Sequence, residues 1–302
     1  MAALSASRPR VVAAQGAIGA NFLVFFTLVE PGDRVIAVHP TYQQLYEVPR
    51  ALGATVDLLR LRPDNGYLPD LDELRGLARG RVKLIVLNNP NNPTGALMPE
   101  AVLREIVAIA DAAGAYVLCD EVYRDLLQAG VAAAPAVVDL YDRGISTGSM
   151  SKVFSLAGLR LGWIAAAEPV IAACLRRRDY TTISCGMLDD ALAVRALERH
   201  DDIMRRNLAI VRGNLAILDG WVAEQPHVDY VKPDAGTTAL LRYDLPVPSV
   251  RLCEGLMRET GTLLTPGSCF EVEGTVRIGY ANAAATLRQG LAQFGAHLAR
   301  LA

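Results

Sequence analysis

Val82-Lys83-Leu84-Ile85-Val86-Leu87-Asn88-Asn89-Pro90-Asn91-Asn92-Pro93-Thr94-Gly95 is the stretch from which the fold of this chain is best worked out. Its first six residues form an apolar run with Lys83 as the only charge, which is typical of a strand covered on both faces. The two Asn-Pro steps that follow force an extended backbone and favour a loop. Asparagine amides therefore stand at the carboxyl end of a strand, where ligands bind in open α/β sheets. An ordinary turn is the alternative interpretation.

Similar patterns extend outward from this stretch. Short apolar runs predict further strands over residues 35–38, 56–59 and 116–119. Amphipathic segments predict helices over residues 20–28, 43–52, 70–78 and 99–113. Strands that alternate with helices in this way predict an α/β fold, with a mostly parallel sheet sandwiched by helices.

The pattern changes in the second half of the chain. Two helical stretches, over residues 169–178 and about 188–225, are rich in Ala, Leu and Arg. Beyond Pro226 the sequence predicts short strands over 228–232, 239–242 and 276–278, with helices over 249–259 and 287–298. We therefore expect a large domain over residues 1–180, connecting helices over 181–225 and a smaller α+β domain over 226–302.

Composition excludes several classes of protein. The chain has 302 residues, 52% hydrophobic and 21% charged, so it can bury a large core. A net charge of -2 gives no basic footprint, which argues against nucleic acid as a partner. Its apolar runs are too short to cross a membrane, and the first ten residues lack the apolar core of a signal peptide. Five cysteines without a Cys-X-X-Cys pair fit a reducing cytoplasm, and neither they nor four scattered histidines suggest a metal site.

A second group of polar residues follows the predicted strand over 116–119. In Cys119-Asp120-Glu121-Val122-Tyr123, the carboxylate of Asp120 could pair with a protonated ring nitrogen, since a buried charge needs an opposite one. Tyr123 would lie close by and could bond a phenolic oxygen. The alternative is a structural role for Asp120 as a helix cap.

The third group is Ser149-Met150-Ser151-Lys152-Val153-Phe154-Ser155-Leu156-Ala157-Gly158-Leu159-Arg160-Leu161-Gly162-Trp163. Lys152 is one of only three lysines, with Lys83 and Lys232, and it stands where an amine could attack a carbonyl. Arg160 could hold an anion with two donors. The flanking residues exclude a phosphate loop of the GxxxxGK[ST] type. A surface lysine and arginine on a turn remain the alternative.

Two weaker signals complete the set. Gln15-Gly16-Ala17-Ile18-Gly19 opens a helix, so its backbone N–H groups could hold a phosphate, although it lacks the GxGxxG spacing of a dinucleotide site. Pro40-Thr41-Tyr42 places an aromatic ring just past the strand over 35–38. A lone tyrosine in this position could equally belong to the core.

Taken together, NPNNPTG, DEVY and SMSKVFSLAGLRLGW, in this order and spacing, resemble the pyridoxal-phosphate-dependent aminotransferases of fold type I, the aspartate-aminotransferase-like class I/II family. The resemblance covers about residues 11–302. It implies pyridoxal 5'-phosphate as cofactor, amino acids and 2-oxo acids as substrates, and a homodimer whose active sites borrow residues from the partner subunit.

The resemblance also implies a role for each matching residue. Lys152 would form the Schiff base with the cofactor and shuttle the proton. Asp120 would pair with the pyridinium nitrogen, and Tyr42 would stack on the ring. Tyr123 and Asn92 would bond the 3-oxygen of the ring. The phosphate would be held by the helix start and by two further side chains: Gly16, Ala17, Ile18, Ser149 and Arg160. Arg277, in Val276-Arg277-Ile278-Gly279-Tyr280-Ala281, would grip the substrate α-carboxylate together with Asn92.

Two departures from the family pattern bear on activity. Relatives usually carry several dozen residues before the strand that begins near Val11, so we expect a chain beginning at Met1 to bind the cofactor weakly or to be poorly active. Residues 178–184 and 233–244 are similar to capreomycidine-synthase-like members, which catalyse β-elimination and ring closure. We prefer transamination because no residue here specifies a guanidinium site. A truncated, inactive relative is the third alternative, but such a protein would be expected to lose Lys152 or Asp120.

Overall fold

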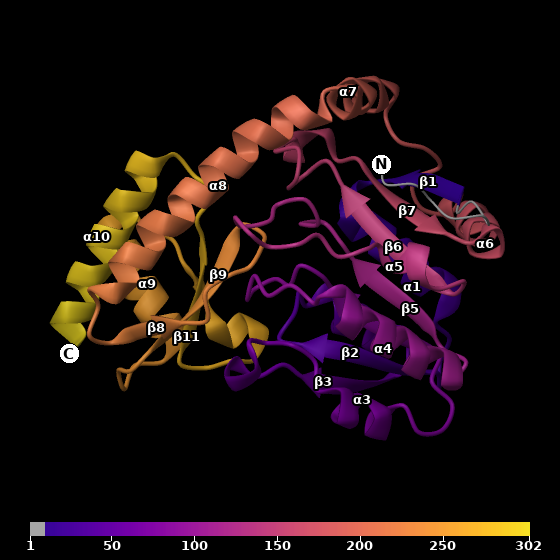
Figure 1. Cartoon of the computed structure of the whole chain (residues 1–302), viewed down its shortest axis with the longest axis horizontal. Helices are drawn as coiled ribbons and strands as arrows, with labels where there is room; N and C mark the ends of the chain where they lie inside the picture. The colour runs from indigo at the N-terminus through magenta and orange to yellow at the C-terminus, as the bar shows by residue number, and fades with distance from the viewer. Residues whose placement is uncertain (1–9) are drawn as a thin grey trace.

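The computed structural model describes residues 10–302, and the expectation about the start of the chain lies outside these residues. Its larger sheet has seven strands in the order β1-β7-β6-β5-β4-β2-β3 (Figure 1). These strands are β1 (Arg10–Ala14), β2 (Arg34–His39), β3 (Thr55–Arg60), β4 (Leu84–Asn88), β5 (Tyr116–Asp120), β6 (Gly144–Ser149) and β7 (Gly162–Ala166). Only β7 runs antiparallel to its two neighbours, which confirms the mostly parallel sheet that the sequence predicts.

Helices cover both faces of this sheet. One face carries α1 (Gly16–Leu28), α2 (Gln44–Ala51) and α6 (Glu168–Arg178). The other face carries α3 (Leu71–Leu77), α4 (Glu100–Ala112) and α5 (Val137–Leu140). Successive strand residues point to opposite faces. In β4, Leu84 and Val86 accordingly pack under the first group of helices, and Ile85 and Leu87 under the second. Two-sided burial explains why this strand reads as a continuous apolar run.

Strand register brings polar residues together at the carboxyl edge of the sheet. Asp120 at the end of β5 lies opposite Asn88 of β4 on one side and Thr147 of β6 on the other. Parallel strands end at the same edge, so three predicted loops, those after β4, β5 and β6, meet there. This edge faces the rest of the chain (Figure 1).

A smaller antiparallel sheet forms the C-terminal part, in the order β10-β11-β9-β8. Its elements are α7 (Met187–Glu198), α8 (His200–Ala223), β8 (Val228–Tyr230), β9 (Thr238–Tyr243), α9 (Ser249–Thr260), β10 (Thr265–Pro266), β11 (Thr275–Gly279) and α10 (Ala284–Leu301). Three short 3-10 turns complete the described chain: η1 (Pro63–Asn65), η2 (Ala157–Leu159) and η3 (Gly267–Phe270). The long helix α8 runs from beside the larger sheet to the smaller one, where α10 packs beside it (Figure 1).

One predicted helix is in fact two. The stretch expected to be helical over 188–225 breaks at Arg199, whose backbone leaves the helical region at φ -110 and ψ 24. Asp201 and Asp202 then occupy the first turn of α8. Carboxylates are favoured at a helix N-terminus, so the sequence His200-Asp201-Asp202 starts a new helix rather than continuing the old one.

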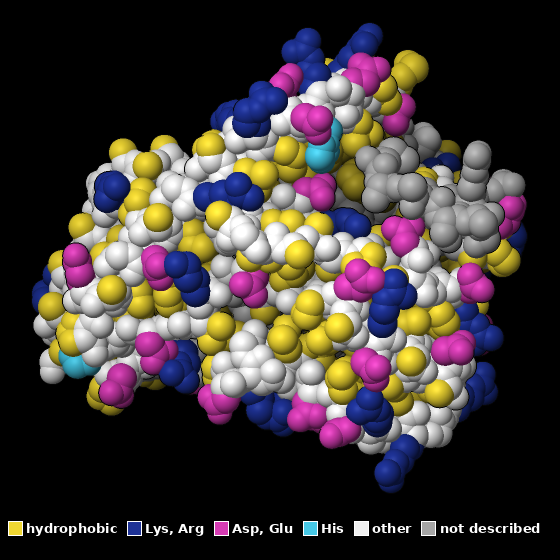
Figure 2. Space-filling view, viewed as in Figure 1, with side chains coloured by type: hydrophobic (Ala, Val, Ile, Leu, Met, Phe, Trp, Pro, Cys, Tyr) yellow, Lys and Arg dark blue, Asp and Glu magenta, His cyan; other side chains and the backbone are white. Residues whose placement is uncertain are grey.

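The surface shows no dominant charge on the face seen in Figure 2, where basic and acidic side chains are interspersed. Within residues 10–302, none of the helices is both long and apolar enough to span a bilayer.

Candidate active site

Lys152 lies in the loop after β6, and the rest of the molecule holds this loop in place. Its Nζ stands 6.0 Å from the centre of the Tyr123 ring, which is buried after β5. The amide of Asn207 in α8 donates to the Val153 carbonyl at 2.8 Å. The predicted amine and the predicted phenol are therefore neighbours, and a helix from the other part of the chain fixes the loop between them.

The surroundings of Lys152 favour its neutral form. The Lys152 side chain is accessible to solvent, but nearby protein atoms partly desolvate its amine. This partial desolvation is the first cause of its lowered pKa. The cations of Arg277 and Arg160 lower the pKa further, and the Asp120 carboxylate opposes them. An amine must be neutral to attack a carbonyl, so the site prepares Lys152 for nucleophilic chemistry.

Asp120 is a buried carboxylate with defined partners. Its side chain is 4% exposed. Burial raises the pKa of Asp120, whereas hydrogen bonds from Asn21 and from the Val122 N–H lower it. Asn21 Nδ2 donates to one carboxylate oxygen at 2.7 Å, and the Val122 N–H donates to the other at 3.1 Å. Ordered donors of this kind let a carboxylate face a cationic nitrogen.

Arg277 and Asn92 form a second polar pair. One Nη of Arg277, in β11, donates to Asn92 Oδ1 at 3.1 Å, and the other donates to Thr265 Oγ1 at 3.1 Å. The guanidinium carbon also lies 5.2 Å from the centre of the Phe270 ring. Asn92 is fixed in turn because its N–H donates to Asn88 Oδ1 at 2.7 Å. A planar, oriented guanidinium of this kind can bind a carboxylate.

A candidate phosphate cradle lies at the start of α1. Gly16 has φ +69, and a Cβ added there would stand 2.8 Å from Nη2 of Arg160, so the guanidinium packs directly against the glycine. A Cβ on Gly162 would stand 2.8 Å from the Ala17 nitrogen. No side chain caps this end of the helix, which leaves the first backbone N–H groups of α1 available. Two backbones kept bare by glycine, a helix N-terminus and an arginine together suit a phosphate.

The remaining predicted residues take less direct positions. Ser149 is buried at the end of β6, where its Oγ accepts from the Ser151 N–H at 3.3 Å. Tyr42 is half-buried beside the cluster under α1 and α2, and it lies near enough to Tyr123 to influence its pKa. The Ile18 side chain is 46% exposed, so only its backbone suits the predicted role.

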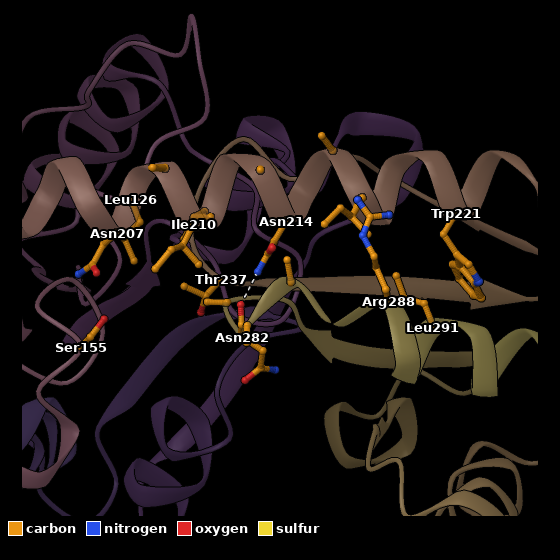
Figure 3. A pocket seen from close by; sticks show the side chains of 18 of the residues that line it. Leu126, Ser155, Asn207, Ile210, Asn214, Trp221, Thr237, Asn282, Arg288 and Leu291 are labelled. Atoms are coloured by element: carbon orange, nitrogen blue, oxygen red, sulfur yellow. Dashed lines mark hydrogen bonds between the residues drawn. The ribbon is translucent and has the colours of Figure 1, made fainter. Parts of the chain in front are cut away.

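A large cavity lies beside these residues. It has a volume of about 1490 Å³ and extends between α8 and the start of α10, with Ser155 at one end (Figure 3). Lys152 also lines it. Asn207, Ile210, Asn214 and Trp221 line it from α8, and Arg288 and Leu291 line it from α10. Asp120, Tyr123 and Asn92 are not among its lining residues. The cavity therefore reaches the candidate site only at Lys152.

Sequence reasoning missed the residues that support the site. Asn21 donates to Asp120 and accepts from Thr147. Asn207 holds the Lys152 loop, and Thr265 accepts from Arg277. One signal was present, since Asn21 is the only amide in the apolar helix α1. A buried amide in such a helix needs a polar partner, which marks it for attention.

The donor set defines the ligand that would fit. A cationic cradle could bind a phosphate, a buried carboxylate could pair with a cationic ring nitrogen, and an amine in its neutral form could attack an aldehyde carbon. The Arg277 guanidinium could bind a separate carboxylate. The residues at this edge therefore fit a phosphorylated pyridine aldehyde together with an amino acid.

Comparison with known proteins agrees with this chemistry. The family model "Aminotransferase class I and II" matches residues 2–294. Capreomycidine synthase of Streptomyces vinaceus is 34% identical over 289 residues, which are 95% of this chain and 74% of that protein. The aspartate aminotransferase of Thermotoga maritima is 28% identical over 294 residues, or 94% of this chain and 74% of that protein.

A solved structure is similar over the same region. The PLP-dependent aminotransferase from Streptococcus suis superposes with a TM-score of 0.93 and 44% identity, covering 97% of this chain and 77% of that chain.

Proposed function

The chain belongs to the class I and II aminotransferases, and from this premise we propose that it moves an amino group between an L-amino acid and a 2-oxo acid. The protein is a PLP-dependent enzyme with the fold of the type I transferases. The observation that carries the proposal is that Lys152, Asp120 and Arg277 lie close enough to interact electrostatically. Each of them has the charge or reactivity that one part of the cofactor or substrate requires: the aldehyde, the ring nitrogen and the α-carboxylate.

Pyridoxal 5'-phosphate would be held at both of its ends. The cradle of Gly16, Ala17 and Arg160 would take the phosphate, and Asp120 would take the ring nitrogen. Tyr123 and Asn92 would bond the 3-oxygen of the ring. When bound, the cofactor supplies an aldehyde for the amine and a protonated ring that withdraws electrons from the substrate's α-carbon.

The residues of the chain would then do the remaining work. Arg277, oriented by Asn92 and Thr265, would bind the substrate carboxylate and so fix the α-carbon in place. Lys152 Nζ, whose pKa is lowered by its surroundings, would in its neutral form take up the proton from the substrate's α-carbon and later give a proton back. Asp120, held as a carboxylate, would keep the ring nitrogen protonated throughout.

A second candidate reaction is elimination with ring closure, favoured by the 34% identity to capreomycidine synthase. Transamination remains our proposal because the side chains that contact Arg277 are Asn92, Thr265 and Phe270, which carry no charge. That arrangement suits a carboxylate and provides no partner for a second cation such as a guanidinium.

A screen of single amino acids tests this proposal. For transamination we expect one equivalent of 2-oxo acid per site in a single turnover, and continued turnover only when a 2-oxo acid acceptor is added. Turnover without an acceptor, with loss of a β-substituent, would instead establish elimination. A protein that releases no product from any amino acid would contradict both reactions.

The three lysines provide matched controls. Lys83 stands 3.9 Å from Asp33, and Lys232 is paired with Asp219. Borohydride reduction should fix the cofactor on Lys152 alone. We expect Lys152→Ala to lower turnover by about 10²–10⁴-fold or more, whereas Lys83→Ala and Lys232→Ala should retain it. A Lys152→Ala protein with full activity would overturn the mechanism.

We also propose that the enzyme works as a homodimer in the cytoplasm. Exposed apolar side chains gather on α7, where Met187 is 84% and Leu188 80% exposed, and others lie on α1, where Ile18 is 46% and Phe22 41% exposed. Thr181 and Thr182, just before α7, line a hollow together with Ile18 and Phe22. Exposed apolar side chains gathered in this way are typical of a subunit interface. All five cysteines are free, as suits a reducing compartment.

A further inference from the structure

A network of hydrogen bonds centred on Asn21 reaches Asp120 and includes Thr147 and Gln44. Thr147 Oγ1 donates to Asn21 Oδ1 at 2.7 Å, and Asn21 Nδ2 donates to Asp120 Oδ2 at 2.7 Å. Asn21 and Thr147 are fully buried, at 0% and 1% exposure. They come from α1 and β6, so the network links two elements to the carboxylate of β5.

A backbone carbonyl outside this network, that of Ile18, fixes the direction of its hydrogen bonds. Gln44 Nε2 donates to the Ile18 carbonyl at 2.6 Å, and a backbone carbonyl can only accept. This bond turns Gln44 Oε1 toward Asn21, whose Nδ2 donates to it at 3.4 Å. The donor end of the Asn21 amide therefore faces Asp120, and its acceptor end faces Thr147.

A reversed Asn21 amide would have the opposite effect. Its oxygen would then face Asp120 Oδ2, and two acceptors can share that position only if the aspartic acid keeps its proton. A protonated Asp120 would no longer be an anion opposite the ring nitrogen. The orientation of one buried amide thus selects the charge state of the carboxylate.

Other titratable groups near Asp120 do not set its charge state in place of the Asn21 amide. The titratable groups that interact electrostatically with it are the Lys152 amine, the Tyr123 phenol and the thiol of Cys119, its neighbour in the strand. Burial raises the pKa of both the phenol and the thiol, so both are neutral near pH 7. Lys152 in its protonated form lowers the pKa of Asp120, but the amine must be neutral to attack a carbonyl, so it gives no lasting control.

We propose that Asn21, oriented by Gln44 and Thr147, is a positioning residue that holds Asp120 as a hydrogen-bond acceptor for the ring nitrogen of the cofactor. The inference rests on the proposed function, because it assigns Asp120 to that nitrogen. Asn21 itself touches neither cofactor nor substrate in this scheme and acts through the carboxylate.

The test follows the protonation of the ring nitrogen in holoenzyme loaded with pyridoxal phosphate carrying 15N in the ring. We expect the NMR titration of Asn21→Leu to show at least a tenfold weaker proton affinity of this nitrogen than in the parent. Thr147→Val and Gln44→Leu should weaken the proton affinity of the ring nitrogen by a smaller factor. Thr147→Ser keeps the hydroxyl and should leave this proton affinity at the parent value. These milder variants also keep the test open if Asn21→Leu does not fold.

Asp120→Asn separates the two levels of the argument. If Asp120→Asn lowers the proton affinity of the nitrogen but Asn21→Leu, Thr147→Val and Gln44→Leu leave it within twofold of the parent, the positioning role is wrong and the proposed function stands. If Asp120→Asn has no effect, or the parent binds no pyridoxal phosphate, the proposed function fails at this residue.

The hydrogen-bond network is then tested in cofactor-free protein by 13C NMR of the Asp120 carboxyl. Asn21→Leu should raise its proton affinity at least tenfold there, and an unchanged titration would overturn the inference.

Discussion

A single methyl group at position 16 should disturb both the backbone and the phosphate cradle. Gly16 has φ +69, and its missing Cβ leaves the space against which the Arg160 guanidinium packs. We expect Gly16→Ala to lower the free energy of unfolding by about 1–2 kcal/mol, the cost of the left-handed backbone. Displacement of the guanidinium should also weaken pyridoxal phosphate binding at least about tenfold, or 1.4 kcal/mol. Thermal unfolding and fluorescence titration with the cofactor measure the two effects.

Gly66 provides the control for this change. It has φ +62 but no atom within 4 Å of an added Cβ. Gly66→Ala should therefore carry the backbone cost alone and keep the parent's affinity for the cofactor. Equal losses of affinity in both variants would show that the space beside Arg160 has no role in phosphate binding.

The lowered pKa of Lys152 gives a prediction about pH. Cofactor capture needs the neutral amine, so its rate in cofactor-free protein should rise with pH through a midpoint below that of an ordinary lysine. Burial is the first cause of the lowered pKa and Arg277 the second. Arg277→Gln removes a cation that disfavours the protonated amine, and it should move the midpoint to higher pH. Stopped-flow absorbance at a series of pH values measures it.

Arg195 is a suitable control because it is an exposed arginine paired with Glu198 on α7. Arg195→Gln should leave the midpoint where the parent has it. An unchanged midpoint in Arg277→Gln, or one that moves to lower pH, would show that this guanidinium does not act on the amine.

At the scale of elements, α8 connects the reactive loop to the smaller sheet through two buried amides. Asn207 donates to the Val153 carbonyl at 2.8 Å. Asn214, two turns further on, donates to the Tyr280 carbonyl at 2.7 Å and to the Asn282 carbonyl (Figure 3). Replacing either amide by leucine leaves buried carbonyls unpaired, so both variants should lose about 1–3 kcal/mol of stability.

The two variants should differ in their effect on the site. Only Asn207→Leu frees the loop that carries Lys152, so only this variant should slow the borohydride fixation of the cofactor under conditions where both proteins are folded. Denaturant unfolding and the rate of fixation are the measurements. Slower fixation in Asn214→Leu to the same degree would mean that α8 acts as one rigid body and not through the Val153 contact.

Individual elements also show what the sequence could predict. β4 and β5 were predictable because two-sided burial leaves a continuous apolar run. That the residues just after them lie together was predictable because parallel strands share a carboxyl edge. The break between α7 and α8 was missed because Arg199 is itself a good helix former, and only the acidic turn after it marks a new start. Asn21 was missed because its partners lie 99 and 126 residues away in the sequence. No local pattern records a contact of that kind.

For the whole molecule, the apolar surface of α7 and α1 predicts how two copies associate. Leu188 is 80% exposed on α7, and Leu263, in the C-terminal part, is 75% exposed. If a second copy covers α7, each Leu188 buried at the interface contributes about 1.5–3 kcal/mol, so Leu188→Glu in both subunits should weaken the dimer at least about a hundredfold.

Leu263→Glu adds the same charge to a similarly exposed site and should leave association unchanged. Sedimentation velocity over a range of concentrations distinguishes the two. Because exposed apolar side chains also lie on α1, whose first turn would hold the cofactor phosphate, dissociation of the Leu188→Glu dimer should also lower affinity for the cofactor. A Leu188→Glu protein that sediments like the parent, or a Leu263→Glu protein that dissociates as readily, would place the interface elsewhere.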